Sequence, residues 1–138
     1  KMKLVHSVSS ATPTQAAIGH FFETGRYDLH MRHLRKKLHL QSLQYIKAIA
    51  DYFPEDTHVM APRGGYVLWI EMDRKVNATE LFHEAMKAAI SIAPGQIFST
   101  DGRFSNFIRI SFGHPYDVVI DKSLRTLGRL AHRLSNRQ

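Results

Sequence analysis

The sequence has no cysteine, so disulfide bridges and thiolate metal sites are excluded. No apolar run approaches the ~20 residues that a membrane helix needs. The basic N-terminal segment KMKLVHSVSS lacks the apolar core of a signal peptide. No Walker, dinucleotide-binding, nucleophile-elbow or paired-carboxylate motif is present. These absences favour a cytoplasmic protein with no membrane partner and leave no recognised catalytic motif.

The composition is that of an ordinary globular chain. Hydrophobic residues make up 43% and charged residues 22% of the 138 positions, enough for one domain with a sizeable core. The net charge of +7 is uneven, because residues 1–50 hold eight Lys and Arg against two acids, and the remainder holds eleven against ten. A basic half indicates a nucleic-acid or phosphate partner, an acidic neighbouring domain, or a solvated helix face. Charge alone favours the last two explanations.

Helical patterns occupy the first third of the chain. In TPTQAAIGHFFETG, Thr12 is a suitable N-cap and Gly25 a suitable stop. A longer helix is expected over 28–52, where apolar residues recur at helical spacing except for a polar gap at Gln41–Ser42.

The period then changes to that of strands. THVMA and YVLWIEM read as two strands joined by the turn PRGG, and a capping box of Asn77 and Glu80 opens a helix. ISIA is expected to form a strand that Pro94–Gly95 ends, with a strand over 96–99 left open. Residues 107–112 form the last strand, and Asp117 caps a final helix.

The expected order is therefore α-α-β-β-α-β-β-α, in the α/β (α+β) class. We predict a small, mainly antiparallel sheet of three to four strands that helices cover on one face.

The last strand carries an arginine in NFIRISFG. Alternation places Ile108, Ile110 and Phe112 on one face, and Phe107, Arg109 and Ser111 on the other. A guanidinium held on a rigid strand suits bidentate pairing with a carboxylate. The alternative is an exposed arginine on the outer face of a half-covered sheet, and the residues alone favour that alternative.

The histidines of the long helix suggest a metal site and its basic residues a nucleic-acid site, but the sequence supports each of them only weakly. His30, His33 and His39 lie there with Asp28 as the only nearby acid, and the surrounding Lys and Arg would repel a cation, so we expect no metal ligands. The run RHLRKK has no aromatic stacking partners and no RNA-module glycines, which favours a solvated helix face.

Four segments together resemble the small domain of the fold-type I pyridoxal-phosphate aminotransferases. They are YDLHMRHLRKKL, PRGGYVLWIEM, ISIAPGQIFS and NFIRISFG, and their order and spacing match over nearly the whole chain. The resemblance is greatest to the aminotransferase-like part of MocR-type regulators, in which a GntR-type winged helix precedes that part. It implies that residues 1–138 are a C-terminal small domain, a fragment of a longer, homodimeric protein.

The resemblance assigns Arg109 to an amino acid's α-carboxylate. It also implies pyridoxal 5'-phosphate in the intact parent, with the cofactor lysine in an absent large domain, and DNA bound through an absent winged helix. It implies neither a catalytic nor a cofactor-binding residue in this chain, which alone would be inactive. Leu38 and Gln41 stand where relatives commonly have tyrosine and arginine.

Two alternatives remain. The first is the small domain of an ordinary cytoplasmic class I/II aminotransferase, in which the same arginine would serve catalysis. The second is a freestanding nucleic-acid-binding module that uses the basic first half, whose signature would be salt-dependent DNA binding.

Overall fold

The structure is a computed structural model that describes residues 12–137 and divides into two units, residues 1–37 and 38–138. The segment KMKLVHSVSS lies outside the described residues. In the first unit, α2 (Thr12–Glu23) is followed by the start of α3 (Arg26–Tyr52). Gly25 makes the turn between them at φ 67°, a left-handed conformation that glycine adopts without strain. Both predicted helices are confirmed, and the second begins two residues earlier than expected.

The described part of the first unit has little core of its own. Helix α2 has no buried residue, and several large apolar side chains are exposed on α2 and the start of α3. They are Ile18, Phe21, Phe22, Tyr27 and Leu29. Phe21 and Phe22 each contact the ring of Tyr27, with centroids 6.3 and 4.7 Å apart.

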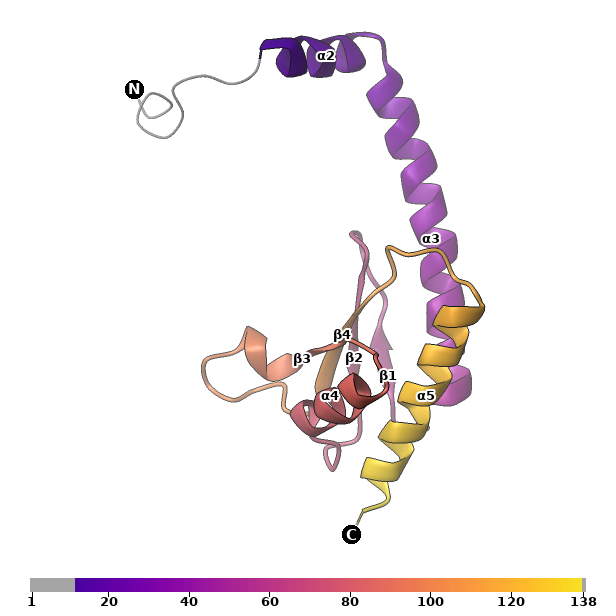
Figure 1. Cartoon of the computed structure of the whole chain (residues 1–138), viewed down its shortest axis with the longest axis vertical. Coiled ribbons are helices and arrows are strands. Elements are labelled where there is room, and N and C mark those ends of the chain that lie inside the picture. Colours follow the sequence, from indigo (N-terminus) through magenta and orange to yellow (C-terminus); the bar gives the residue numbers. More distant parts are fainter. Residues whose placement is uncertain (1–11, 138) are drawn as a thin grey trace. The chain divides into compact units, whose positions relative to one another are not determined.

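The second unit is built on a four-stranded sheet whose strand order is β1-β2-β4-β3 (Figure 1). The strands are β1 (His58–Met60), β2 (Val67–Glu71), β3 (Ala93–Pro94) and β4 (Phe107–Ser111). All neighbouring strands are antiparallel. The predicted class, element order and antiparallel sheet are therefore confirmed.

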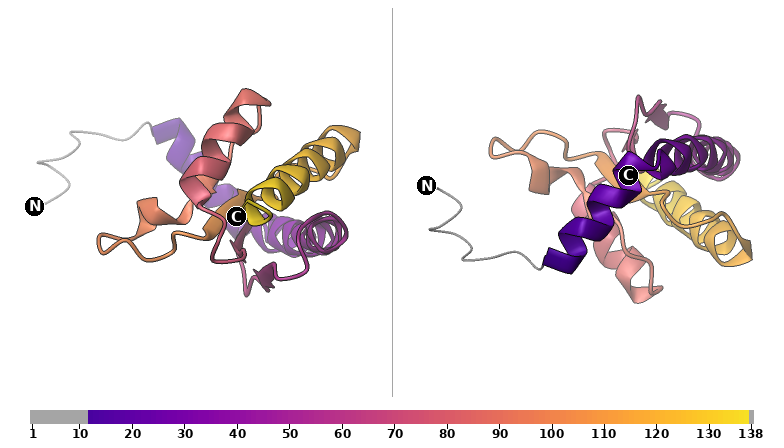
Figure 2. Two further views of the ribbon diagram at one scale, coloured as in Figure 1. Left: turned by 90° about the horizontal axis from the view of Figure 1, so that it is seen from below. Right: turned by 90° about the horizontal axis from the view of Figure 1, so that it is seen from above.

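Helices cover one face of this sheet, as predicted. They are the second half of α3, α4 (Ala78–Lys87) and α5 (Val118–Ser135), and α3 and α5 run side by side (Figures 1 and 2). Leu68, Ile70 and Ile108 point from the two central strands into the core, where none is exposed. The helices meet them with apolar side chains that include Tyr45, Ile49, Leu81, Ala85, Leu127 and Ala131.

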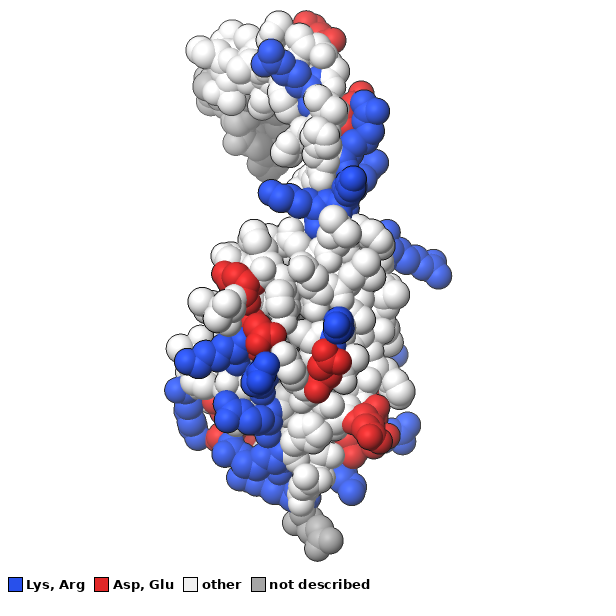
Figure 3. All heavy atoms as spheres, turned by 90° about the vertical axis from the view of Figure 1, so that its right-hand side faces the viewer, with Lys and Arg blue, Asp and Glu red and all other residues white. Residues whose placement is uncertain are grey.

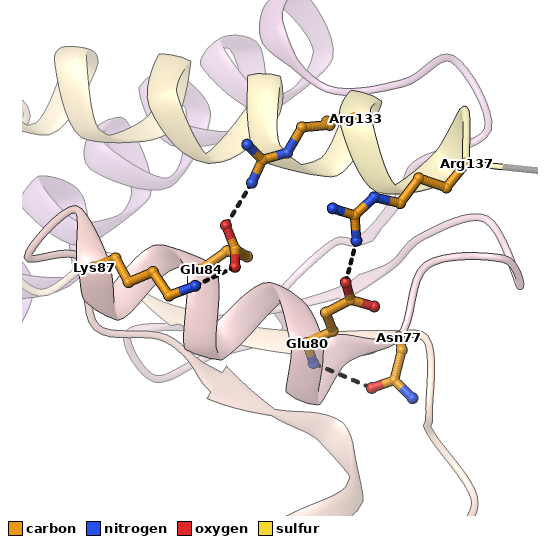
Figure 4. Close-up of polar contacts among 6 residues, drawn as sticks. All are labelled: Asn77, Glu80, Glu84, Lys87, Arg133 and Arg137. Carbon is orange, nitrogen blue, oxygen red and sulfur yellow. Dashed lines mark hydrogen bonds and ion pairs between the residues drawn. The ribbon is translucent and has the colours of Figure 1, made fainter.

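Ends of the helices follow the capping pattern of the sequence. The Asn77 side chain accepts hydrogen bonds from the backbone N–H groups of Thr79 and Glu80, at 2.9 and 3.2 Å. Asp117 accepts one from the N–H of Ile120 at 2.8 Å. The Glu80 carboxylate pairs at 2.5 Å with Arg137, two residues beyond the end of α5, so it links α4 to the segment that follows α5 (Figure 4).

A second ion pair links α4 and α5. Glu84 binds Arg133 at 2.5 Å and Lys87 at 2.6 Å (Figure 4). The Lys87 and Arg133 side chains are exposed, so each of these pairs adds little stability.

The strand predicted at ISIA was wrong in extent. The N–H of Ile90 bonds to Ala85 O at 2.9 Å and Ala89 adopts φ 57°, so residues 88–90 complete the C-terminus of α4. The strand is instead Ala93–Pro94, and the position open at 96–99 belongs to a 3-10 helix, η1 (Gly95–Phe98). Proline is tolerated in β3 because this strand lies at the sheet edge.

Candidate functional site

The sheet face opposite the helices carries the site candidate. Arg109 lies at the centre of β4 on this open face, paired across the sheet with Trp69 of β2 and Ala93 of β3. Directly paired residues share a face, so the side chains of Arg109 and Trp69 project to the same side. The predicted alternation in β4 is confirmed, since Ile108 is buried and Arg109 is exposed.

Three phenylalanine rings surround the indole of Trp69, and we call the four residues the aromatic cluster: Trp69, Phe98, Phe104 and Phe107. The Trp69 ring stacks on Phe107 with centroids 5.5 Å apart, and it meets Phe98 and Phe104 edge-on at 5.6 and 5.4 Å. The cluster thus joins β2, β4 and the segment between β3 and β4.

That connecting segment is held closely against the sheet. A Cβ atom at Gly95 would lie 2.8 Å from the Cβ atoms of both Phe104 and Phe107, so only glycine allows this approach. Phe104 adopts φ 65°, an unusual conformation for an aromatic residue, and its carbonyl accepts a hydrogen bond from the N–H of Phe107 at 3.1 Å. Gln96 of η1 accepts a hydrogen bond from the Thr79 hydroxyl of α4 at 2.6 Å.

The guanidinium of Arg109 lies over the ring of Phe98, with Cζ 4.5 Å from the ring centroid. Arg109 makes no ion pair within the described range 12–137. A guanidinium packed against an aromatic ring keeps its in-plane N–H groups available for hydrogen bonds. The arrangement therefore offers an exposed, positively charged donor set on a rigid strand.

A hollow of about 420 Å³ is lined by residues 97–101, 103 and 104, so Phe98 and Phe104 belong both to it and to the aromatic cluster. Its only carboxylate is Asp101, which pairs with Arg103 at 2.6 Å and accepts a hydrogen bond from Ser99. The Ser99 hydrogen bond, followed by that from Arg103, holds the pKa of Asp101 below its usual value. Arg103 is therefore already paired, whereas Arg109 has no such partner in the described residues.

The described residues offer few groups that could bind a metal ion or a cofactor. The described residues contain no group of three or more His, Cys, Asp or Glu that could hold a metal ion. Pyridoxal phosphate requires a lysine, and no lysine lies in the four strands or in residues 93–113. The described open face thus has no lysine that could hold this cofactor, and the cationic group at its centre is Arg109. Among the helices of residues 12–137, none has the length and apolarity to cross a membrane.

Two other features singled out in the sequence are Gln41 and the basic run RHLRKK. Gln41 is buried, and its side-chain amide donates to the carbonyls of Phe112 and His114 at 3.0 and 2.9 Å. The basic run RHLRKK is mostly exposed on the first half of α3, where Lys and Arg side chains have few acidic neighbours (Figure 3). Sequence reasoning missed Phe98 and Trp69; the alternation in YVLWIEM indicates the face of Trp69, but no local pattern indicates the contact between Phe98 and Arg109.

Comparison with known proteins gives consistent relatives, although no protein-family model matches the chain. The HTH-type transcriptional regulator YdcR of Escherichia coli is 32% identical over 130 residues, which cover 94% of this chain and 28% of YdcR. The HTH-type regulator YjiR of the same organism is 30% identical over 132 residues, 96% of this chain and 28% of YjiR.

Among solved structures, the α-aminoadipate aminotransferase LysN of Thermus thermophilus superimposes with a TM-score of 0.82 at 21% identity, covering 97% of this chain and 34% of LysN. The chain thus spans about 28% of the length of its curated regulator relatives and about a third of LysN. The resemblance seen in the sequence is confirmed: the chain has the fold of the matching part of the aminotransferase LysN and is similar in sequence to part of the HTH-type transcriptional regulators YdcR and YjiR.

Proposed function

We propose that this chain is the C-terminal small domain of a longer regulator of the GntR/MocR type, and that Arg109 binds the α-carboxylate of an amino-acid effector. The similarity to YdcR and YjiR over almost the whole chain supports the regulator. The observation that carries the ligand class is the exposed Arg109 guanidinium, which lies on a central strand without an anionic partner in the described residues.

The chemistry of Arg109 fits a carboxylate better than a neutral group. Arginine stays charged at all physiological pH values, and its planar fork matches both oxygens of a carboxylate. A strand with neighbours on both sides holds the Cα atom in place, so a bound carboxylate would also be oriented. Helices α4 and α5 and the second half of α3 cover the opposite face, so among the described residues the open face has room for a ligand and for another part of the protein.

The remainder of the proposed protein supplies what this chain lacks. Pyridoxal phosphate would be held by a lysine in a large domain, and DNA by a winged helix, in a cytoplasmic homodimer. In such a protein Arg109 would hold the carboxylate end of the amino acid, and the cofactor would supply an aldehyde carbon for its amino group. Binding at both ends of one small molecule would change how the two domains pack and thereby alter DNA binding.

Titration of the full-length protein with each of the twenty common L-amino acids and their α-amides tests this proposal. We expect at least one free acid to bind and raise the melting temperature, and its amide to bind far more weakly. Arg109→Ala should weaken binding at least about thirtyfold, because two charge-assisted hydrogen bonds are lost.

Arg74→Ala is the matched control, because Arg74 is also exposed and lies in a loop outside the open face. It should bind amino acids as the wild-type protein does. The proposal is wrong if no amino acid binds the wild-type protein, or if Arg109→Ala binds them with unchanged affinity.

A catalytic aminotransferase is the second candidate, and the TM-score of 0.82 with LysN favours it. Both candidates use Arg109 in the same way, so amino-acid binding does not separate them. Transamination by the full-length protein, with no DNA bound at its own promoter, would identify the enzyme. Promoter binding that changes with the amino acid would identify the regulator.

A further inference from the structure

Phe98 is the residue that contacts the Arg109 guanidinium directly. The guanidinium carbon lies 4.5 Å from the ring centroid of Phe98, and the Trp69 ring packs against Phe98 in a T-shaped arrangement with centroids 5.6 Å apart. Phe98 comes from η1 and Arg109 from β4, so the contact joins two elements across the open face. We infer that Phe98 is a positioning residue, which holds the Arg109 guanidinium in the orientation that receives a carboxylate.

The physical reason lies in the freedom of an exposed arginine. Four side-chain torsions allow many orientations, and a ligand must fix them on binding. Contact with an aromatic ring restricts the guanidinium through cation–π attraction and leaves its N–H edge available. Phe98 thus removes part of the ordering cost before the ligand arrives.

Phe98 is suited to this role because its backbone is anchored on two sides. Gln96, in the same 3-10 helix, binds the Thr79 hydroxyl of α4 at 2.6 Å. Gly95 brings the start of this helix against Phe104 and Phe107, and a Cβ atom at Gly95 would lie only 2.8 Å from the Cβ atoms of both. Trp69 supports the Phe98 ring from β2. The ring that meets Arg109 is therefore fixed by α4 and by the sheet.

This inference rests on the proposed function, and the same titration of the full-length protein with the twenty L-amino acids tests it. Phe98→Ala and Phe98→Leu should each weaken binding about two- to fivefold, the effect of an exposed cation–π contact. Phe98→Tyr retains the aromatic face and should bind as the wild-type protein does. Ile97→Ala is the matched control, because Ile97 is the neighbouring residue of η1 and is 65% exposed.

The pattern across ligands separates positioning from direct contact. If Phe98 acts through Arg109, Phe98→Ala should weaken every bound amino acid by the same factor, because all share the α-carboxylate. A loss that depends on the ligand's side chain would mean that Phe98 touches the ligand itself, and would overturn the inference. Full binding by Phe98→Leu, or an equal loss in Ile97→Ala, would also overturn it, since either would indicate a purely structural role.

Failure of this inference and failure of the proposed function give different results. If Arg109→Ala loses binding and Phe98→Ala does not, the carboxylate site stands and only the positioning role is wrong. If Arg109→Ala binds normally, the proposed function is wrong and the positioning role is wrong with it.

Discussion

Gln41 illustrates how one polar residue can determine a helix's position. Its side-chain amide lies in the core, only 8% exposed, and donates to two carbonyls that follow β4. In Gln41→Ala both carbonyls lose this donor where water has little access. We expect the free energy of unfolding to fall by about 1–3 kcal/mol, measured by urea denaturation with circular dichroism.

Gln44 provides the matched control, because it lies one turn further along α3 and is exposed. Gln44→Ala should change the free energy of unfolding by less than about 0.5 kcal/mol. Equal losses in the two variants would show that helix propensity, and not the buried hydrogen bonds, determines the effect.

Asp121 gives the stability a dependence on pH. Hydrogen bonds from the hydroxyls of Tyr116 and Tyr52, at 2.7 and 2.8 Å, hold the pKa of Asp121 below its ordinary value of 3.8. A lowered pKa in the folded state stabilises the fold above the unfolded-state value, and this stabilisation is lost as the pH falls through the folded-state value. Asp121→Asn should therefore be less stable than wild type at neutral pH, with the difference shrinking in acid.

Urea denaturation at a series of pH values between about 7 and about 2 measures this convergence. Asp51→Asn serves as the control, because Asp51 is exposed on α3 and makes no hydrogen bond or ion pair with its side chain in the described structure. Parallel pH profiles for wild type and Asp121→Asn would contradict the prediction.

At the scale of elements, the contact between α3 and α5 depends on Gly128. A Cβ atom there would lie 2.8 Å from the carbonyl carbon of Tyr52 and 3.1 Å from its Cβ. Backbone atoms cannot move aside as a side chain can, so Gly128→Ala must push the two helices apart. We expect a loss of about 1–3 kcal/mol in the free energy of unfolding, measured by chemical denaturation.

Gly64→Ala is the corresponding control, since Gly64 lies in the turn between β1 and β2 with no atom within 4 Å of an added Cβ. It should be neutral or slightly stabilising, because alanine restricts the unfolded chain more than glycine does. A Gly128→Ala protein as stable as Gly64→Ala would show that the helices separate at little cost.

Elements with local signals could be predicted from the sequence, and elements fixed by distant contacts could not. The caps Asn77 and Asp117 begin α4 and α5 as expected, because a cap binds N–H groups two or three residues away. The strand at ISIA was misplaced, because Ile90 bonds back to the end of α4 and thereby delays β3. Ile90 could either bond back to α4 or pair in the sheet, and no local sequence signal distinguishes these two patterns.

The same distinction holds for the site. Alternation alone placed Arg109 opposite the core face of β4, and the structure agrees. Gln41 interrupts the apolar stripe of the long helix, which the sequence shows. The two carbonyls that its side-chain amide binds lie more than 70 positions further along the chain, so the sequence does not indicate them. Likewise, the ring that meets Arg109 belongs to η1, which carries no helical or strand pattern strong enough to place it.

At the scale of the whole molecule, the first unit leaves a large apolar surface without a partner in the described residues. Ile18, Phe22 and Leu29 are each 50% exposed or more, and α2 has no buried residue. Exposed apolar side chains of this size promote association when they lie together. In the proposed longer protein, other parts of the aminotransferase-like domain would cover this surface.

The 138-residue chain produced alone should therefore self-associate, and sedimentation velocity over a wide range of concentration measures the extent. Phe22→Gln combined with Leu29→Gln should shift the chain toward monomer, because glutamine keeps the helices and removes the apolar surface. Val118→Gln with Val119→Gln is the control, since these valines are 84% and 69% exposed at the start of α5. A monomeric wild-type chain, or an equal shift in both double variants, would show that the exposed apolar surface of the first unit does not drive association.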